Sequence, residues 1–338
     1  MKCTDKKKRK RKKNTAGRVI ALILTVIIFS GAGAAGAYFL NNASGDQLLD
    51  YEQKNYRQSI WQGTFFAQDL CVAAENVSLD GFADEDSLHA AGLFDINSNQ
   101  VVYGFRLYDK LYPASTTKIM TAYLALKYGN LDDIVTVSEH ATDFNWDEVT
   151  SGLRTGDQVS LYDLVCGLML RSGNDCGTAI AEHISGSEEA FAELMNREAR
   201  ALGATGTHFT NPHGLHDENH YTTAYDLYLI FNACLKDERF VEIISMDSYD
   251  GTLTGADGTV RTETWIPSNY YSNGTVEAPD GVRVFGGKTG TTDQAGCCVI
   301  LYSEDMQEHP YISVIMGAED KNFLYQEMNR LFTAGISE

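Results

Sequence analysis

The sequence predicts an α/β protein of the α+β type, in which both ends of one domain build a single sheet around an inserted helical lobe. Near the start of this domain, the apolar runs Leu88–Ile96 and Val101–Leu107 flank a turn rich in Asn and Ser, which predicts a β-hairpin. Near its end, Gly296–Tyr302 and Tyr311–Met316 predict two more strands, and a final helix is expected at about 322–332. Strands on both sides of a helical middle indicate one shared sheet.

Five helices are expected in that middle. The first, Ser115–Lys127, places Ile119, Tyr123 and Leu126 on one stripe, and Gly129 follows as a C-terminal stop. Similar patterns predict the other four helices at 160–171, 175–185, 187–202 and 223–235.

The first 40 residues differ from the rest. Residues 1–18 carry ten Lys or Arg and one acidic residue, and Val19–Leu40 has no charge over 22 residues. An apolar run of this length can cross a bilayer as a helix, and its positive flank stays in the cytoplasm. We therefore expect a cytoplasmic tail at 1–18, a transmembrane anchor at 19–40, a stalk at 41–62 and an exported domain at 63–338. A cleaved signal peptide, with "AGAAGA" at the cleavage site, is the alternative.

The charge balance bears on nucleic-acid binding. The basic tail alone could indicate such binding. The 320 residues that follow it, however, carry 17 basic and 45 acidic residues, a net charge of −28. Because such a surface repels phosphates, we expect no nucleic-acid partner.

The cysteines and histidines do not suggest a metal site. None of the seven cysteines forms a C-x-x-C pair or a ligand spacing with histidine, so no metal or other cofactor is expected. Cys166, Cys176 and Cys234 fall in apolar helical patterns and are interpreted as buried. Disulfides after export stay open as an alternative. His213 and Gly214, in the "NPHGL" stretch, are interpreted as parts of a structured loop rather than as catalytic groups.

A nucleophile and its base are suggested by "PASTTKIM" at 113–120. Ser115 and Lys118 are three residues apart, which places both side chains on one helix face. A serine hydroxyl becomes a good nucleophile when a base takes its proton, and a lysine can be that base only when it is neutral. By itself the pattern fits equally well a capping serine followed by a surface lysine.

Two further motifs change that balance. "SGN" at 172–174 lies at a junction between two expected helices, and "KTG" at 288–290 precedes the strand "AGCCVI". Alone, the first could be a polar turn and the second a glycine turn entering a strand. All three patterns occur once each, in the order and rough spacing typical of serine acyl-transferases that recognise penicillin.

With these motifs the chain resembles the low-molecular-mass penicillin-binding proteins of the D-alanyl-D-alanine carboxypeptidase type. The similarity extends through 172–191 and 191–230, including "NPHGL" and "TTAYDL", and covers about 88–332. The resemblance implies the β-lactamase/transpeptidase-like fold, with an antiparallel sheet and a large helical lobe.

The resemblance also implies a role for each motif residue. Ser115 would be acylated, Lys118 would take its proton, and Ser172 would relay a proton to the leaving amine. The other implied roles are substrate binding by Asn174, Lys288, Thr289, Gly290 and Thr291, with Lys288 and Thr289 holding the terminal carboxylate and the N–H groups of Ser115 and Thr291 forming the oxyanion hole.

The implied reaction is removal of the terminal D-alanine of a peptidoglycan pentapeptide through an acyl-enzyme, without a metal. The expected partners are the stem peptide ending in D-Ala-D-Ala, β-lactams as covalent inhibitors, and the membrane through the N-terminal helix. The expected location is the bacterial cell membrane, with a single span and the catalytic domain outside.

Two departures from the family pattern concern attachment and binding. Only 48 residues follow Gly290, so a second, β-rich domain is not expected, and the N-terminal anchor would take over attachment. Where relatives often carry an arginine, the stretch "GAEDKNF" offers Lys321 as its only cation. Carboxylate binding would then rest mainly on Lys288 and Thr289.

Other functions could use some of the same residues. A class A-like β-lactamase needs a glutamate for deacylation, but no E-x-x-L-N pattern lies between Asn174 and Lys288, and "SGN" replaces "SDN". A DD-endopeptidase would use the same groups on a neighbouring bond and stays open. A transpeptidase is less expected, because such enzymes usually bring extra domains. The complete set of motif residues argues against a non-catalytic wall-binding or β-lactam-sensing module.

Overall fold

The structure is a computed structural model and describes residues 66–82 and 87–336. The chain divides into two units, 1–68 and 69–338, and the architecture below is that of the second unit. The expected tail, anchor and stalk lie outside the described residues. Within the described ranges, no helix combines the length and apolarity needed to cross a membrane.

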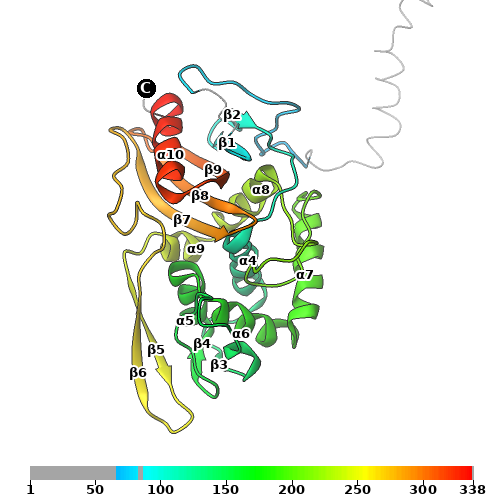
Figure 1. Cartoon of the computed structure of the whole chain (residues 1–338), viewed down its shortest axis with the longest axis vertical. Helices are drawn as coiled ribbons and strands as arrows, with labels where there is room; N and C mark the ends of the chain where they lie inside the picture. The colour runs from blue at the N-terminus through cyan, green and yellow to red at the C-terminus, as the bar shows by residue number, and fades with distance from the viewer. Residues whose placement is uncertain (1–65, 83–86, 337–338) are drawn as a thin grey trace, which may run out of the picture. The chain divides into compact units, whose positions relative to one another are not determined.

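The main sheet has five antiparallel strands in the order β2-β1-β9-β8-β7. Strands from the two ends of the domain meet at its centre, where Ala91 of β1 pairs with Ile315 of β9. The prediction of one sheet built from both ends is therefore confirmed (Figure 1). The strands are β1 Ala90–Asp95, β2 Gln100–Phe105, β7 Arg283–Thr292, β8 Gly296–Glu304 and β9 Pro310–Ala318.

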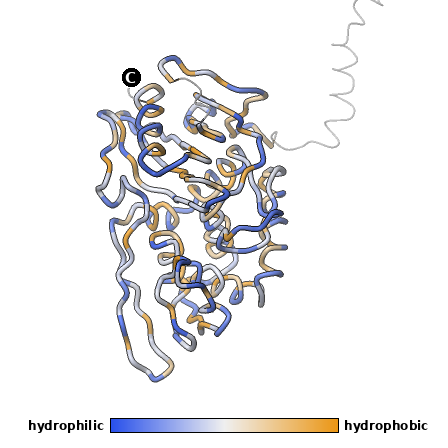
Figure 2. Tube along the Cα trace, viewed as in Figure 1, coloured by the Kyte–Doolittle hydropathy of each residue, from blue (hydrophilic) through white to orange (hydrophobic). Residues whose placement is uncertain are grey.

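Both faces of this sheet are covered by helices, which explains its apolar strands. Leu93 points into an apolar cluster with α10 (Lys321–Gly335), and its neighbour Phe94 points into the cluster that includes α8 (Ala224–Cys234). This is the period of two that a strand imposes on its side chains. Figure 2 colours the chain trace by hydropathy and shows hydrophobic and hydrophilic residues interspersed along it.

The helical lobe surrounds α4 (Lys118–Tyr128), whose eleven residues include eight buried ones. Its other helices are α5 (Leu161–Cys166), α6 (Asn174–Ser185), α7 (Glu188–Ala201) and α9 (Glu238–Ile244). Side-chain caps mark several of the predicted helix starts: the Ser187 and Thr223 hydroxyls accept from backbone N–H groups three residues on. Gly129 follows α4, as predicted.

Two predicted helices differ in detail. The helix expected at 160–171 is α-helical only to Cys166 and continues as a π-helical turn, η4 (Gly167–Arg171). The helix expected from Ser115 begins as a 3₁₀ turn, η2 (Ala114–Thr117), before α4. Both irregular turns carry motif residues or lead into them, which fits the tendency of such turns to occur at functional sites.

A second sheet was not expected from the sequence. It contains β3 Ile134–Thr136, β4 Gln158–Ser160, β5 Tyr249–Thr254 and β6 Val260–Trp265, in the order β3-β4-β5-β6. β3 and β4 are three residues long, and β5 and β6 expose Asp250, Thr252, Thr262 and Thr264 on one face. Such short or polar strands carry too few apolar residues to show a period of two.

The six cysteines in the described part of the chain are all free thiols and all buried. Cys166, Cys176 and Cys234 lie in the interior of the helical lobe, as their apolar context predicts. No disulfide links any of these six residues.

Candidate active site

Ser115 lies in η2, the turn between Pro113 and α4. Ala114 before it has a φ of +47°, a region that non-glycine residues rarely adopt. Ser115 is part-buried, and no side chain caps the turn. The alternative of a capping serine is thus not what the structure shows, because the Ser115 hydroxyl faces Lys118 instead.

Lys118 is fully buried, and its Nζ has three partners. It lies 3.0 Å from Ser115 Oγ, 2.8 Å from Asn174 Oδ1 and 2.6 Å from the carbonyl oxygen of His213. Burial, and secondly the charge of Lys288, lower the pKa of Lys118 well below its ordinary value. A neutral amine has two N–H donors, which suit the amide and carbonyl oxygens, and a lone pair that can accept the Ser115 proton.

Ser172 and Lys288 form a second pair. Ser172 ends η4 with a φ of +69°, and its hydroxyl accepts a hydrogen bond of 2.8 Å from Lys288 Nζ. Lys288 is 1% exposed and also donates to the carbonyl of Thr289 at 2.9 Å. Burial, and secondly the charge of Lys321, lower the pKa of Lys288 to about 7. This amine can therefore change its charge near neutral pH.

The "KTG" motif lies inside β7 rather than in a turn before a strand. β7 runs close beside η2: a Cβ atom added to Gly290 would lie 2.9 Å from Ser115 N and 2.9 Å from Pro113 O. Only a glycine fits there without displacing the turn that carries Ser115. The neighbouring Thr289 hydroxyl lies 2.6 Å from Ser268 Oγ, and Thr291 is exposed.

The "NPHGL" loop packs against η2 and α4 from the other side. Gly214 has a φ of +88°, and a Cβ atom there would lie 1.9 Å from Ala114 O. His213 contributes its carbonyl to Lys118, whereas burial lowers the pKa of its imidazole well below the ordinary value. The interpretation of His213 and Gly214 as a structured loop agrees with this packing.

His220 supports the same turn. Its Nδ1 accepts from the N–H of Thr210 at 3.0 Å, so its Nε2 carries the proton and donates to Thr117 Oγ1 at 2.8 Å. Burial lowers the pKa of His220 to about 4, so the ring is neutral at neutral pH. The sequence analysis assigned no role to this histidine, although it lies close to "NPHGL".

Asp175, which the sequence analysis also missed, holds the wall next to "SGN". Its buried carboxylate accepts from the N–H groups of Ser151, at 2.8 and 2.9 Å, and of Leu153, at 3.1 Å. The N–H of Asn174 donates to the carbonyl of Val149 at 2.8 Å. These bonds fix the start of α6 and with it the Asn174 amide that contacts Lys118. In the sequence, only the position of Asp175 directly after the "SGN" motif could have pointed to this role.

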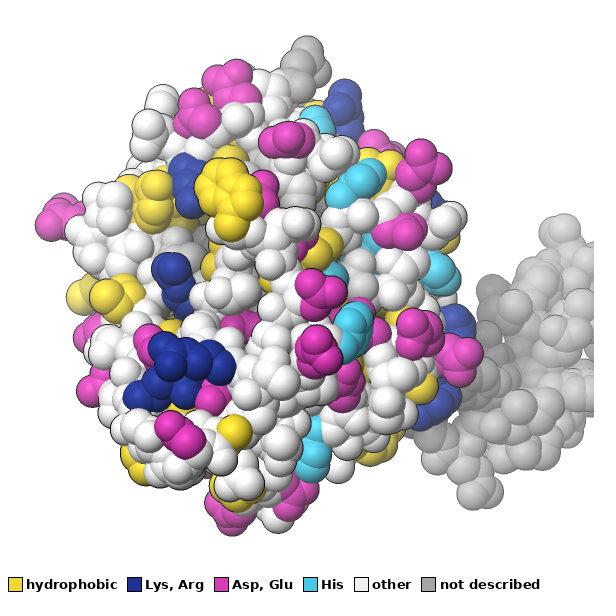
Figure 3. Space-filling model, turned by 60° about the horizontal axis from the view of Figure 1, so that its bottom comes forward, with side chains coloured by type: hydrophobic (Ala, Val, Ile, Leu, Met, Phe, Trp, Pro, Cys, Tyr) yellow, Lys and Arg dark blue, Asp and Glu magenta, His cyan; other side chains and the backbone are white. Residues whose placement is uncertain are grey.

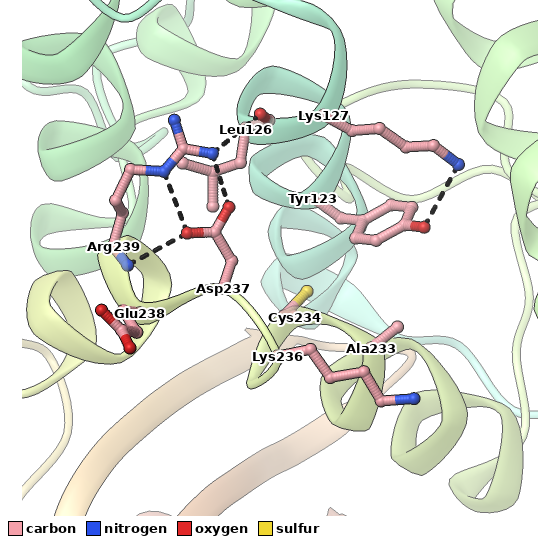
Figure 4. Close-up of a pocket in the computed structure, with 9 residues that line it drawn as sticks. All are labelled: Tyr123, Leu126, Lys127, Ala233, Cys234, Lys236, Asp237, Glu238 and Arg239. Atoms are coloured by element: carbon pink, nitrogen blue, oxygen red, sulfur yellow. Dashed lines mark hydrogen bonds and ion pairs between the residues drawn. The ribbon is translucent and has the colours of Figure 1, made fainter.

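A pocket of about 710 Å³ lies away from these residues, at the end of α4 (Figure 4). Tyr123 and Lys127 line one side of it, and Asp237 and Arg239 line the other. Three of its five charged side chains are already paired, since Lys127 contacts Glu198 and Arg239 contacts Asp237, each at 2.6 Å. None of the eight expected site residues lines this pocket. In the described ranges, no group of three or more His, Cys, Asp or Glu side chains could hold a metal ion.

The structure therefore brings the three motifs together. The Lys118 amine contacts both Ser115 and Asn174, and Gly290 lies against the Ser115 backbone. Ser172 joins through Lys288, which lies close enough to Lys118 to affect its pKa.

The chain is similar to known proteins in sequence and in fold. The model of the D-alanyl-D-alanine carboxypeptidase family matches residues 82–320. The carboxypeptidases DacF of Bacillus subtilis and DacC of Escherichia coli are each 34% identical to the chain, over 74% and 72% of it respectively. DacA of Haemophilus influenzae is 32% identical over 79% of the chain.

The alignments cover 62%, 60% and 66% of those three relatives, so the chain spans less than two thirds of their length. Among solved structures, the Streptomyces K15 DD-transpeptidase superposes with a TM-score of 0.69 at 24% identity. That match covers 75% of the chain and 99% of the K15 protein, and it shows the fold.

Proposed function

Because the chain belongs to the D-alanyl-D-alanine carboxypeptidase family, we propose that it is a serine-type carboxypeptidase that removes the terminal D-alanine from peptidoglycan stem peptides. The observation that carries the proposal is the buried Lys118 amine, 3.0 Å from the Ser115 hydroxyl. A buried amine in contact with a serine hydroxyl and held by two further acceptors is suited to activating that serine.

Acylation would begin with transfer of the Ser115 proton to the neutral Lys118 amine. Ser115 Oγ would then attack the carbonyl carbon of the penultimate D-alanine. The developing oxyanion would be stabilised by the N–H groups of Ser115 and Thr291. The close approach of Gly290 to Ser115 N supports this arrangement, because it brings the β7 backbone next to that N–H group.

Collapse of the tetrahedral intermediate would break the C–N bond and release D-alanine. Its amine needs a proton, and Ser172 would relay to it the proton that Lys118 took from Ser115, which leaves Lys118 neutral again. Lys288, whose Nζ lies 2.8 Å from the Ser172 hydroxyl, would set the local potential. Water would then attack the ester on Ser115, with Lys118 accepting the water proton, and the free serine would be restored.

Substrate binding would use the polar groups around this centre. Asn174 would contact the substrate amide, and Lys288 with Thr289 would hold the terminal carboxylate. A carboxylate next to Lys288 would favour its charged form, opposing the burial that lowers its pKa to about 7. β-Lactams carry a comparable carboxylate and would acylate Ser115 in the same way.

The remaining features of the proposal concern location. Residues 1–18 would be a cytoplasmic tail, 19–40 an anchor and 41–62 a stalk, with the catalytic domain from residue 63 outside the bacterial cell membrane. Trypsin protection of residues 1–18 in sealed membrane vesicles of right-side-out orientation would support this topology.

The deciding experiment measures free D-alanine released from diacetyl-Lys-D-Ala-D-Ala by the purified full-length protein. We expect release that penicillin blocks, and no release or penicillin labelling with Ser115→Ala. Labelling without release would favour the DD-endopeptidase. Neither release nor labelling would favour the non-catalytic module.

A further inference from the structure

Trp146 is 96% exposed, the largest value among the big apolar side chains of the described residues. Trp265, by contrast, is 2% exposed, and its indole N–H donates to the carbonyl of Ser151 at 2.9 Å. Single exposed apolar residues are common on protein surfaces. What distinguishes Trp146 is the way the chain holds its indole and what lies next to it.

The segment that carries Trp146 is a closed turn. The N–H of Glu148 donates to the carbonyl of Asn145 at 3.0 Å, and the Glu148 carboxylate accepts from the N–H of Asn145 at 2.6 Å. Trp146 and Asp147 are the two central residues between these bonds. The turn itself thus presents the indole to solvent.

Both ends of this turn contact the active site. On one side, the Phe144 ring packs edge-on against the His213 ring at 5.6 Å, and the His213 carbonyl accepts from Lys118. On the other side, the carbonyl of Val149 accepts from the N–H of Asn174 at 2.8 Å. The indole therefore projects from a wall of the active site.

Space for a ligand continues next to this wall. A pocket of about 390 Å³ begins two residues after Glu148, and Thr150, Ser151 and Arg171 are among the residues that line it. Arg171 directly precedes Ser172, and Ser151 is bonded to Asp175. The pocket thus adjoins the "SGN" motif at Arg171 and follows the turn closely in the chain at Thr150.

The charges around the indole restrict the chemistry of what it can bind. Asp143 and Asp147 are exposed on either side of it, and neither carboxylate has a partner within the described part of the chain. Acidic side chains are also numerous on the face shown in Figure 3. Such surroundings repel anionic lipid and phosphate.

A neutral polyhydroxylated ring fits both features. The C–H bonds of a pyranose can pack on the negative face of the indole, and its hydroxyls can donate to the carboxylates. We infer that Trp146 forms a sugar-binding subsite that holds the glycan to which the stem peptide is attached. This inference rests on the proposed function, since it assigns the glycan portion of the same substrate.

The test compares two substrates with the full-length protein: diacetyl-Lys-D-Ala-D-Ala, and a pentapeptide carried on the N-acetylglucosaminyl-N-acetylmuramyl disaccharide. Trp146→Ala should raise KM for the disaccharide substrate roughly two- to tenfold, the range of a single aromatic contact. Turnover of the free peptide should stay within about twofold, because the catalytic groups are untouched. Trp146→Phe should keep the KM for the disaccharide substrate close to the wild-type value.

Met306→Ala is the matched control, since Met306 is 77% exposed in the turn between β8 and β9. This substitution should change neither KM nor turnover for either substrate. Equal losses on both substrates with Trp146→Ala, or no loss on either, would overturn the inference. Loss of binding to phosphatidylglycerol vesicles, with unchanged turnover of the disaccharide substrate, would overturn it in favour of a membrane contact.

A second measurement needs no turnover. In the Ser115→Ala background, an N-acetylglucosamine tetramer should protect tryptophan fluorescence from acrylamide quenching, and adding Trp146→Ala should remove that protection. Protection that persists without Trp146 would contradict the subsite. A protein that releases no D-alanine from either substrate would refute the proposed function, while this binding assay would still decide on Trp146.

Discussion

The pH dependence of catalysis provides a sharp test of the two buried lysines. Lys118 must be neutral to accept the Ser115 proton, so kcat/KM should rise as pH rises through its lowered pKa. In the proposed function Lys288 holds the substrate carboxylate and must be charged to do so, and burial lowers its pKa to about 7. The profile of kcat/KM should therefore have two limbs, the alkaline one falling near neutral pH.

The size of the alkaline limb follows from that pKa. With a pKa of about 7, roughly nine tenths of Lys288 is charged at pH 6 and roughly one tenth at pH 8. Provided that the pH lies above the limb set by Lys118, kcat/KM should fall about tenfold between those values. D-Alanine release at substrate concentrations well below KM measures this ratio directly.

Lys288→Arg is the matched variant, because a guanidinium keeps its charge at all pH values used. It should flatten the alkaline limb, whatever it does to the absolute rate, and the rate of acylation by penicillin should change in the same way. A wild-type profile that continues to rise to pH 9, with the same shape in Lys288→Arg, would refute the role of Lys288 in binding the carboxylate.

Three further substitutions test the geometry. Lys118→Ala should lower the rate of penicillin acylation by about 10²- to 10⁴-fold, because the base is lost; a rate within tenfold of wild type would exclude Lys118 as the base. Gly290→Ala should reduce acylation at least about tenfold, since its Cβ would lie 2.9 Å from Ser115 N; calorimetry should show that the fold persists, and undiminished acylation would contradict the close approach. Asp175→Asn should lower the free energy of unfolding by about 1–3 kcal/mol, because the amide cannot accept all its backbone bonds; unchanged denaturant midpoints would contradict that role.

Strong local patterns explain what the sequence analysis predicted correctly. The hairpin of β1 and β2, and the pair β8 and β9, have long apolar runs because helices cover both faces of their sheet. The helices of the lobe carry apolar stripes and capping residues such as Ser187 and Thr223. The three motifs could be recognised because each is a short pattern of particular side chains, and the structure brings them together.

The features that were missed depend on the backbone or on distant contacts. β7 carries glycines because its backbone must approach η2 closely at Gly290, and this composition looks like a turn in the sequence. His213 contributes its backbone carbonyl oxygen, which every residue type has, so the residue type at this position does not reveal the contact with Lys118. Asp175 accepts from residues 22 to 24 positions earlier, a pairing that only the folded chain reveals.

The two buried lysines also connect activity with stability. Burial lowers the pKa of Lys288 from its usual 10.5 to about 7 in the folded chain, and it lowers the pKa of Lys118 as well. Between pH 7 and 10.5 the unfolded chain therefore binds more protons at Lys288, so this residue makes stability rise with pH across that window. The proposed catalysis requires the charged form of Lys288, which is the form that the fold disfavours. A substrate carboxylate next to Lys288 would reverse this preference only in the complex, so carboxylate binding should be coupled to proton uptake near neutral pH.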